Sequence, residues 1–539
     1  MNCLAVEVGE GGPIVVVDCG VTFPDAPRGI DVFHPDLRWL VARRDRIAGV
    51  LVTHGHEDHI GAIPFLARAV GPVPVHGPPY ALALVRERLA EHANLPHAKL
   101  RDLPPLVPTT PRRSFALGAD FEIEPIRVTH SIADATALVI RTGLGTVLHT
   151  GDFKIDPDPL DGEQFDVDRF AQVGREGVDL LLSDSTSIDM VGTSRSERTV
   201  AGALERLIVD APARVVVTLF ASNVHRLRAL AAIAGQTRRK LVLLGRGVST
   251  HVRAATETGY LAIPPELFAS VEQAATLPRE QVLVVATGSQ GEARAALARL
   301  ALDDHPQLRL SPGDRVLLSA RAIPGNERGV MRMIGDLHRR GCDVRMWATD
   351  PDIHASGHAY RDEQRRMIDL CAPRAFVPVH GNRHHLERHA VLAREAGVGS
   401  VVVVENGEVV AVEGGQVQKA GTVPSGMVAT FDGLPIAPEV LQERRMLGEV
   451  GVVFAHVVVD AEGRAVAPPS IAVRGLPRAT EQGIADEVVA TLETHPFSET
   501  TTETVAEVVR QAARRGAARE TGQKPVAVPL VVKERGSAT

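Results

Sequence analysis

Three histidines and two acidic residues lie within six consecutive positions, His54-Gly55-His56-Glu57-Asp58-His59. Imidazole at neutral pH offers a lone pair to a borderline metal such as zinc, and a carboxylate adds negative charge. Alternating His54 and His56 would project to one side of an extended loop, and Asp58 and His59 would follow as the chain turns into a helix. This pattern predicts ligands for two neighbouring metals. A solvated histidine-rich loop is the alternative, and the apolar strand that precedes the motif disfavours it.

Further ligands are expected where other predicted strands end. His130, Asp152 and His380 each follow a short apolar run, and Asp152 is the natural bridge between two metals because a carboxylate has two oxygens. Taken alone, each of the three would be a capping or core residue. Two metals about 3.5–4 Å apart can activate water and stabilise both ends of a phosphoester displacement. The same arrangement can hydrolyse a lactam or a thioester, so the ligands alone do not identify the substrate.

The elements that position these residues belong to an α/β protein. Strands that end in polar residues dominate residues 1–195 and return over 351–425, which together predict one domain in two parts. Between them, 196–350 alternates strand and helix patterns and predicts a parallel-sheet domain of its own. Residues 426–445, in a Gly- and Pro-rich stretch, are expected to form a linker, and 446–539 a small α/β C-terminal domain.

Composition narrows the metal chemistry and the location. The 539 residues include 21 histidines but only 19 aromatic residues and four scattered cysteines, so a metal site should use nitrogen and oxygen ligands. The net charge of −7 means that overall charge gives no support for nucleic-acid binding. A local basic groove can still exist on an acidic protein. No apolar run could span a bilayer, and the N-terminus lacks a signal-peptide pattern. We therefore expect a cytoplasmic protein with no membrane partner.

The order of these motifs resembles a known family. Residues 1 to about 189 resemble the metallo-β-lactamase fold, an αββα sandwich. Three segments are similar to motifs of the β-CASP nucleases, namely Leu181–Thr186, Phe220–Arg226 and Val377–Asn382. Three more segments complete a resemblance to the bacterial ribonuclease J family over essentially the whole chain, namely Thr287–Glu292, Ile323–Glu327 and His354–His358. The resemblance implies a metallo-β-lactamase sandwich with an inserted β-CASP α/β domain and a small α/β C-terminal domain.

The resemblance also implies roles for individual residues. Asp58, Asp184 and His380 would be catalytic, with Asp184 as an acid/base or a ligand-orienting group, and Asp18 would support the metal loop from behind. Two zinc ions per subunit would be held by His54, His56, Asp58, His59, His130, Asp152 and His380. Substrate phosphates would be held by Ser222, Asn223, Val224 and His225, and by His354, Ala355, Ser356, Gly357 and His358.

The activity implied is 5′-to-3′ exonucleolytic removal of nucleotides from single-stranded RNA with a 5′-monophosphate, plus endonucleolytic cleavage, in RNA maturation and mRNA decay. The resemblance further implies a homodimer or homotetramer and association with other RNA-degrading enzymes. RNA would thread between the lactamase and β-CASP domains. Aromatic stacking residues are scarce, which predicts weakly sequence-specific binding along the backbone. The aromatic residues other than phenylalanine that could stack on a base are Trp39, Trp347 and Tyr360. Four arginines near motif loops could line an RNA groove or could equally be solvated, namely Arg246, Arg294, Arg321 and Arg383.

Three alternatives remain open. The chain could be a β-CASP nuclease that acts on DNA, a small-molecule hydrolase on the same fold, or a catalytically silent RNA-binding subunit. The inserted domain argues against the second, and the seven filled ligand positions argue against the third. The family usually has an earlier strand and a glycine-rich turn before the segment that starts at Met1. We therefore expect either a misassigned start codon or an incomplete sheet edge.

Overall fold

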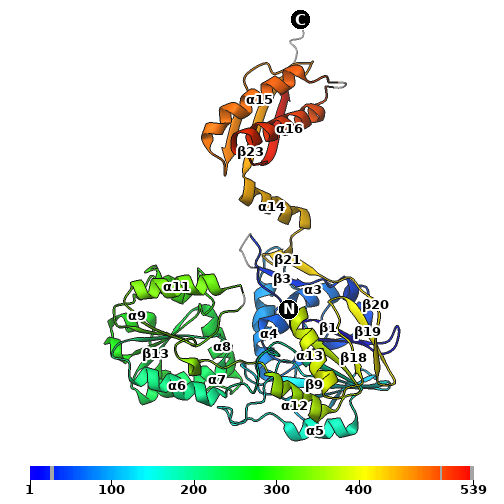
Figure 1. Ribbon diagram of the computed structural model, residues 1–539, viewed down its shortest axis with the longest axis vertical. Coiled ribbons are helices and arrows are strands. Elements are labelled where there is room, and N and C mark those ends of the chain that lie inside the picture. The colour runs from blue at the N-terminus through cyan, green and yellow to red at the C-terminus, as the bar shows by residue number, and fades with distance from the viewer. Residues whose placement is uncertain (25–28, 324, 498–499, 535–539) are drawn as a thin grey trace. The chain divides into compact units, whose positions relative to one another are not determined.

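Two sheets of short strands pack face to face in the computed structural model, which describes residues 1–24, 29–323, 325–497 and 500–534 (Figure 1). The first sheet contains, in spatial order, β1 (Leu4–Glu7), β2 (Ile14–Val17), β4 (Ile47–Leu51), β5 (Val75–Gly77) and β6 (Leu106–Pro108). The second contains β18 (Ser400–Val401), β17 (Ala375–Val379), β11 (Leu180–Asp184), β10 (Gly145–His149), β9 (Thr136–Thr142), β8 (Phe121–Arg127) and β7 (Phe115–Leu117).

Apolar side chains from both sheets fill the space between them. Val15 and Leu51 of the first sheet share a buried cluster with Ile123 and Leu138 of the second, and all four are at most 3% exposed. Helices cover the outer faces: α4 contacts β5 and β6, and α12 and α13 contact β11 and β17. This confirms the predicted αββα sandwich. The helices are α1 (Arg38–Val41), α2 (Glu57–Ile60), α3 (Ile63–Val70), α4 (Pro79–Ala93), α5 (Val167–Glu176), α12 (Arg361–Cys371) and α13 (Arg383–Glu395).

The sandwich is interrupted by an inserted domain. β11 and β17 are parallel neighbours in register, with Asp184 opposite Val379, although they lie far apart in the sequence. The chain therefore leaves the sheet after β11 and re-enters it beside the same strand. Because both strands end at the same edge, the residues that follow them, Ser185 and His380, arrive side by side, and Ser185 N donates to Val379 O and His380 O.

The insert is a five-stranded parallel sheet with helices on both faces, as expected (Figure 1). Alternate residues of one strand face opposite cores, since Val215 and Val217 pack with α6 and α7 while Val216 packs with α10 and α11. The strands in spatial order are β13 (Lys240–Leu244), β14 (Val282–Ala286), β12 (Val215–Thr218), β15 (Arg315–Leu318) and β16 (Asp343–Met346). The helices are α6 (Glu197–Val209), α7 (Val224–Gln236), α8 (Arg246–Glu257), α9 (Val271–Thr276), α10 (Ala296–Ala301) and α11 (Glu327–Arg339).

The segment expected as a linker, 426–445, contains regular structure, and the boundary between the two compact units of the chain falls within it. Strand β21 (Met427–Phe431) pairs antiparallel with β3 (Val32–Pro35) and precedes β22 (Leu434–Pro435), and helix α14 (Pro438–Val450) follows. Asp432 and Gly433 both have positive φ, +50° and +72°, and form the turn between β21 and β22. The Gly- and Pro-rich composition thus marks turns around a short strand. Upstream, β19 (Glu408–Glu413) and β20 (Gln416–Thr422) form a hairpin.

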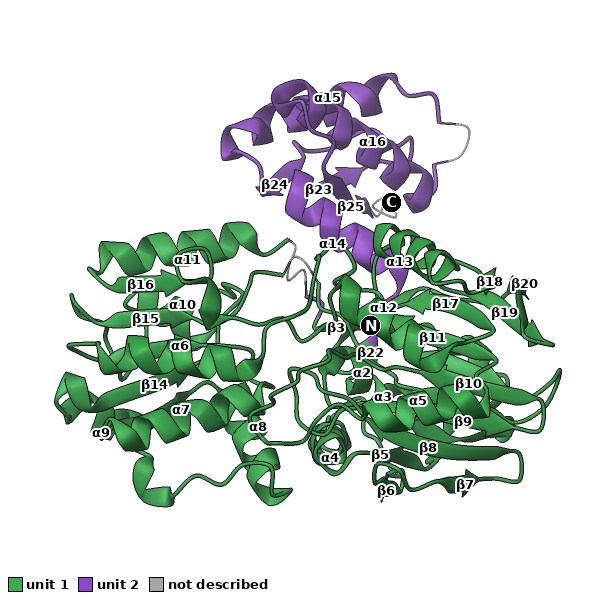
Figure 2. Ribbon diagram, turned by 60° about the horizontal axis from the view of Figure 1, so that its bottom comes forward, with its two compact units in different colours: residues 1–25, 31–434 green, residues 26–30, 435–539 purple. Residues whose placement is uncertain are grey.

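The chain divides into two units, Met1–Asp25 with Asp31–Leu434 and Ala26–Ile30 with Pro435–Thr539 (Figure 2). In the second unit, β24 (Ser470–Arg474), β23 (Val452–Val459) and β25 (Val526–Lys533) form a sheet that packs on α15 (Glu481–Thr494) and α16 (Thr502–Thr521).

Pro324 of the expected motif 323–327 and residues 535–539 of the predicted C-terminal domain lie outside the described residues. Within the described chain, no helix is both long and apolar enough to cross a membrane. The short 3₁₀ turns are η1 (Arg44–Arg46), η2 (Pro265–Leu267), η3 (Arg279–Gln281), η4 (Pro351–Ile353) and η5 (Arg478–Thr480).

A buried ion pair holds the start of α7 against α6. Arg226 Nη2 lies 2.7 Å from Glu197 Oε1, both side chains are at most 3% exposed, and Arg226 also donates to Ser319 O. Although burial opposes ionisation, Arg226 and then Lys154 lower the pKa of Glu197 to about 2. Because the folded pKa lies below the ordinary value of 4.5, this contribution to stability is complete above that value and is lost as the pH falls towards 2.

We predict that Arg226→Met destabilises the chain by about 3–5 kcal/mol, because it leaves the Glu197 carboxylate buried without its partner. Urea unfolding monitored by circular dichroism measures the change. Glu197→Gln combined with Arg226→Met should cost clearly less than the sum of the two single variants, since the charge left unpaired is then gone. Additive losses would contradict this account of the pair.

Candidate metal centre

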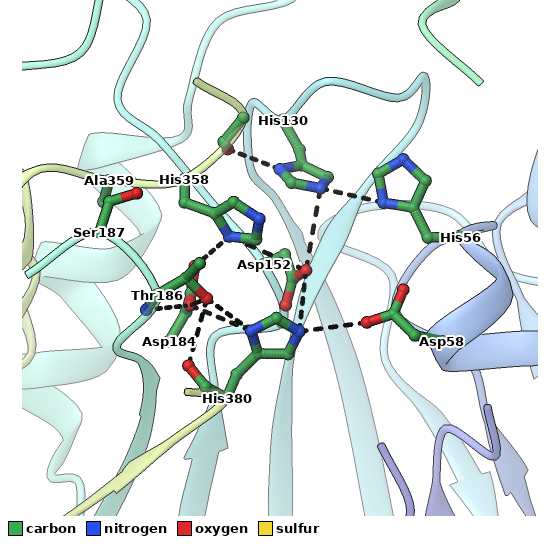
Figure 3. Close-up of polar contacts among 12 residues, drawn as sticks. His56, Asp58, His130, Asp152, Asp184, Thr186, Ser187, His358, Ala359 and His380 are labelled. Carbon is green, nitrogen blue, oxygen red and sulfur yellow. Dashed lines mark hydrogen bonds and ion pairs between the residues drawn. The ribbon is translucent and has the colours of Figure 1, made fainter. Parts of the chain in front are cut away.

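The loop His54–His59 joins β4 to α2, and its side chains meet those at the ends of three other strands (Figure 3). His56 is the N-cap of α2 with extended backbone, so the chain changes direction between His56 and Asp58. At the end of β17, His380 has a left-handed φ of +53°, which few residues with a side chain adopt. That conformation turns its imidazole towards Asp58 and Asp152, as Figure 3 shows.

Three imidazoles converge in the first ligand group. His56 Nδ1 lies 3.0 Å from His54 Nε2 and 3.2 Å from His130 Nε2. Asp152 Oδ2 lies 3.8 Å and 3.9 Å from the same two nitrogens of His54 and His130. These separations suit atoms that surround one metal ion with tetrahedral angles.

The second group shares one of those carboxylate oxygens. Asp58 Oδ2 lies 3.5 Å from His59 Nε2 and 3.3 Å from His380 Nε2. Asp152 Oδ2 lies 3.3 Å and 3.4 Å from the same two nitrogens. Asp152 therefore stands between the two groups, which is the position of a bridging ligand. All seven residues that the sequence nominated as metal ligands lie in these two groups.

The outer nitrogen of each imidazole has its own polar partner. Asp18 Oδ2 accepts from His59 Nδ1 at 2.8 Å and from Thr53 Oγ1 at 2.8 Å, while Thr53 Oγ1 accepts from His54 Nδ1 at 3.0 Å. Asp18 thus supports two ligands, one directly and one through a hydroxyl. Each bond keeps a proton on the outer nitrogen and leaves the inner lone pair for a metal.

A similar hydroxyl supports the far side of the centre. Thr186 Oγ1 lies 2.6 Å from His380 Nδ1 and donates to Asp184 Oδ1 at 2.7 Å. Asp184 is fully buried at the end of β11, and its backbone N donates to Thr150 Oγ1. His380 is consequently fixed from one side by Thr186 and from the other by Asp58 and Asp152.

Protonation differs between the two groups. Burial lowers the pKa of His54 and His130 well below the ordinary value and that of His56 to about 4, so these imidazoles are neutral. Burial opposes charge on His59 as well, but nearby Asp152 and Asp58 raise its pKa to about 10. A metal in the second group would take the place of protons that these carboxylates now attract. The nitrogen and oxygen donors, their convergence and their supported outer atoms fit two borderline divalent cations.

His358 lies beside the metal ligands, as expected of a residue that would hold phosphates near the metals. Its Nδ1 is 2.8 Å from Asp184 Oδ2 and 3.9 Å from Asp152 Oδ2. Burial opposes its charge, yet Asp184 raises the pKa of His358 above its ordinary value. The Asp184 carboxylate therefore favours the charged form of His358 at the edge of the centre, where the two side chains meet (Figure 3).

The neighbouring loop packs closely on a ligand. Gly357 O accepts from His130 Nδ1 at 2.6 Å. A Cβ at Gly357 would stand 2.5 Å from Ser131 Oγ and 2.8 Å from His130 Cε1, so only glycine lets the loop come this close. Ser356 Oγ accepts from the backbone N of His358 and lies 3.5 Å from Ser187 Oγ.

Several residues nominated for substrate binding occupy other places. Asn223 is 2% exposed, caps α7 by accepting from Arg226 N, and donates to Glu197, so its amide oxygen and its amide nitrogen both bond inside the insert. Val224 and Ala355 are core residues, 1% and 3% exposed. The helix start and the loop turn these three side chains into packed interiors, and the assignment of the three positions to substrate binding stays a prediction.

The remaining nominated residues lie in different places, and only one of them contacts a metal ligand. His225 Nδ1 lies 3.6 Å from Asp161 Oδ2, away from the two ligand groups. His354 is half-buried, and burial lowers its pKa to about 3. Ser222 Oγ lies 3.0 Å from His56 Nε2 and thus contacts a ligand.

Sequence reasoning missed some side chains that support the site. Asn2 Nδ2 donates to Asp58 Oδ2 at 3.2 Å and lies 2.9 Å from His59 Nε2. Thr53 and Thr186 adjoin residues that were identified, and their hydroxyls were the available signal. Nothing in the local pattern around Asn2 marks it, because its contacts depend on how β1 and α2 pack.

Comparison with known proteins gives a consistent family. The sequence matches four family models: Metallo-beta-lactamase superfamily over residues 1–187, Ribonuclease J, beta-CASP domain over 212–337, Zn-dependent metallo-hydrolase RNA specificity domain over 351–404, and Ribonuclease J C-terminal domain over 439–534. A solved structure of a protein of unknown function from Enterococcus faecalis shares the fold, with a TM-score of 0.53 and 16% identity over 74% of this chain and 94% of that one.

Curated relatives agree over most of the chain. Ribonuclease J of Mycolicibacterium smegmatis is 38% identical over 97% of this chain and 93% of its own length. The relatives of the same name from Synechocystis and Thermus thermophilus are 38% and 39% identical, over 90% and 82% of this chain and 76% and 77% of their own lengths.

We predict different metal losses from two aspartate variants. Asp152→Asn should weaken both metal sites because Asp152 lies in both groups, whereas Asp58→Ala should weaken only the second and leave the protein folded. Plasma mass spectrometry measures the metal content after dialysis. The content should fall towards no ion per chain in Asp152→Asn and towards one ion per chain in Asp58→Ala. Equal losses in the two variants would contradict the bridging position of Asp152, and circular dichroism controls for folding.

Proposed function

The chain belongs to the ribonuclease J family of metal-dependent ribonucleases, and we propose that it removes nucleotides from the 5′ end of single-stranded RNA that carries a 5′-monophosphate and also cleaves RNA internally. The observation that carries the proposal is the Asp152 carboxylate shared by two ligand groups. Two divalent metals held by these groups would supply the Lewis acidity that activates water and stabilises the attacking and leaving oxygens of a phosphodiester.

We propose two zinc ions per subunit. Five imidazoles and two carboxylates make up the two groups, and cysteine is absent from both. Zinc accepts nitrogen and oxygen ligands at low coordination number, whereas magnesium and calcium prefer oxygen. The homodimer or homotetramer, the companion RNA-degrading enzymes and the cytoplasmic location stay predictions.

Proton supply to the departing O3′ oxygen falls to His358. Both nitrogens of His380 are engaged, one by Thr186 and the other by Asp58 and Asp152. His358 uses Nδ1 to bind Asp184, which leaves Nε2 to hold and donate a proton. Asp184 orients this imidazole and stabilises its charged form, so its role is to support a neighbouring acid.

The 5′-phosphate would be held beside this acid. The hydroxyls of Ser187 and Ser356 lie 3.5 Å apart, next to His358. Hydroxyl and protonated imidazole donors are suited to a terminal phosphate, which carries more charge than an internal phosphodiester. A preference for 5′-monophosphate over 5′-hydroxyl ends follows from that extra charge.

One stacking platform stands at the end of two strands of the insert. Trp347 follows β16 and is 40% exposed, and the Arg321 guanidinium, which follows β15, lies 4.3 Å from its ring centroid. Arg321 also contributes to lowering the pKa of His354, which places it near the loop that precedes His358. A base stacked here would be bound without regard to its identity. Arg383, by contrast, pairs with Glu387 and Glu405 on the surface.

We predict that RNA labelled at its 5′ end is degraded to mononucleotides, fastest with a monophosphate, and slower with a hydroxyl or triphosphate end. Gel electrophoresis with thin-layer chromatography of the products measures this. Longer labelled fragments report the internal cleavage. Asp58→Ala, which lacks a ligand of the second site, should cleave none of the substrates at detectable rate.

Three results would contradict the proposed function. If Asp58→Ala still degraded RNA in a metal-dependent way, the second metal site would not be required for cleavage. Faster hydrolysis of matched single-stranded DNA would favour a nuclease of another class. Tight RNA binding without any turnover in the metal-loaded wild-type protein would favour a silent subunit.

We predict that Trp347→Ala weakens RNA binding about tenfold, in line with the loss of one stacked base at about 1–3 kcal/mol. Trp347→Phe should keep most of the affinity because it retains an aromatic face. Trp39 carries a similar arginine, with Arg43 at 4.4 Å, but belongs to α1, so Trp39→Phe is the matched control and should bind as wild type. Fluorescence anisotropy with the metal-loaded protein and an RNA whose linkages resist hydrolysis separates binding from cleavage, and an unchanged Trp347→Ala affinity would exclude the platform.

A further inference from the structure

Two ligands of the first group are held by segments that lie beyond the first part of the sandwich. His130 is held by Gly357 O, in the loop that follows the insert, and His56 is held by Ser222 Oγ, inside the insert. His54, His59 and His380 are instead supported by Thr53, Asp18 and Thr186 of the sandwich itself. The first ligand group is therefore completed across a domain boundary.

The contact with Ser222 decides how the His56 ring is used. Its Nδ1 faces the nitrogens of His54 and His130 at 3.0 Å and 3.2 Å, so Nδ1 must present the lone pair to a metal. The ring proton then resides on Nε2, and Ser222 Oγ, at 3.0 Å, accepts it. A hydrogen bond of this kind fixes both the tautomer and the rotation of a metal-ligating histidine.

Ser222 is itself rigidly placed by the insert. It precedes α7, where Val224 N donates to Ser222 O and Asn223 N donates to Phe220 O, both at 2.9 Å. The adjoining Asn223 is locked to Glu197 and Arg226 in the buried ion-pair network. The backbone that carries the hydroxyl is therefore fixed within the insert.

A second polar contact crosses the same boundary. The Tyr80 hydroxyl of α4 lies 2.6 Å from His251 Nδ1 of α8, and α4 packs on α8. Tyr80 is fully buried and is not among the ligands. This pair therefore holds the insert in place without supporting a metal ligand, and so it provides a control for Ser222.

We propose that Ser222 is a positioning residue that couples the seating of the inserted domain, by which we mean its packing against the sandwich, to metal occupancy of the first site. The proposal rests on the metal-dependent function above and reassigns Ser222 from phosphate binding. A seated insert presents the Ser222 oxygen to His56 and raises metal affinity. By linkage, a metal in the first site favours the seated insert by the same factor.

Metal titration of the full chain without RNA tests the proposal. Co²⁺ is added to the metal-free protein in competition with a chelating dye, and the two dissociation constants are fitted for wild type, Ser222→Ala, Ser222→Thr and Tyr80→Phe. We expect Ser222→Ala to weaken one site about 10–100-fold and to leave the other unchanged. Ser222→Thr, which keeps a hydroxyl, should restore the affinity, and Tyr80→Phe should leave both constants as in wild type.

Several outcomes would overturn the proposal. The first is that Ser222→Ala binds metal with wild-type dissociation constants, and the second is that Ser222→Thr does not restore the affinity. The third is an equal loss of metal affinity in Tyr80→Phe, which would mean that domain seating acts without the Ser222 bond. Thermal unfolding of each metal-free variant shows whether it is folded. The titration involves no cleavage, so its result does not depend on whether the RNA substrate is correct.

Kinetics separate the positioning role from phosphate binding. With Ser222→Ala, kcat should fall at limiting Zn²⁺ and recover when Zn²⁺ is raised, with KM for RNA unchanged. A raised KM that excess Zn²⁺ does not restore would assign Ser222 to the substrate and overturn the proposal.

Discussion

The structure depends on one constraint: an imidazole that gives its lone pair to a metal must place its other N–H on an acceptor. Five imidazoles face this requirement within one small buried volume, so acceptors must arrive from several directions. Asp18, at the end of β2, and Thr186, after β11, supply two of them. Since Asp18, Thr53 and Thr186 and most of the ligands follow strands of the sandwich, the edges of its two sheets must come together, and this explains why the polar residues cluster at strand ends.

The insertion point satisfies the same constraint. β11 and β17 are parallel neighbours, so the chain can leave and return at one edge without disturbing the sandwich. Asp184 and His380 are brought together by that register and are joined through Thr186. The insert starts and ends beside the metal centre, and the turn before α7, which carries Ser222, reaches the ligand His56.

Much of this arrangement could be predicted from local sequence. The spacing within His54–His59 and the apolar runs before His130, Asp152 and His380 carry their own information, because a strand end is a local feature. The partner of Ser222 could not be predicted, since it depends on how two domains sit together. Asn223 was assigned to substrate for a similar reason, because only the folded insert shows that Glu197 and Arg226 bury it. The linker was predicted from glycines that in fact form turns around β21.

Charge explains how an acidic chain can act on a polyanion. The chain carries −7 overall, but an RNA phosphate at the centre would respond mainly to groups within a Debye length, about 8 Å at physiological salt. Two divalent metals would cancel the charge of four carboxylates at the centre, namely the ligands Asp58 and Asp152 and the neighbouring Asp18 and Asp184. Asp184 also favours the charged form of His358, which adds positive charge beside the metals. The attraction for phosphate is therefore created by the bound metals, and the rest of the surface can stay acidic without opposing catalysis.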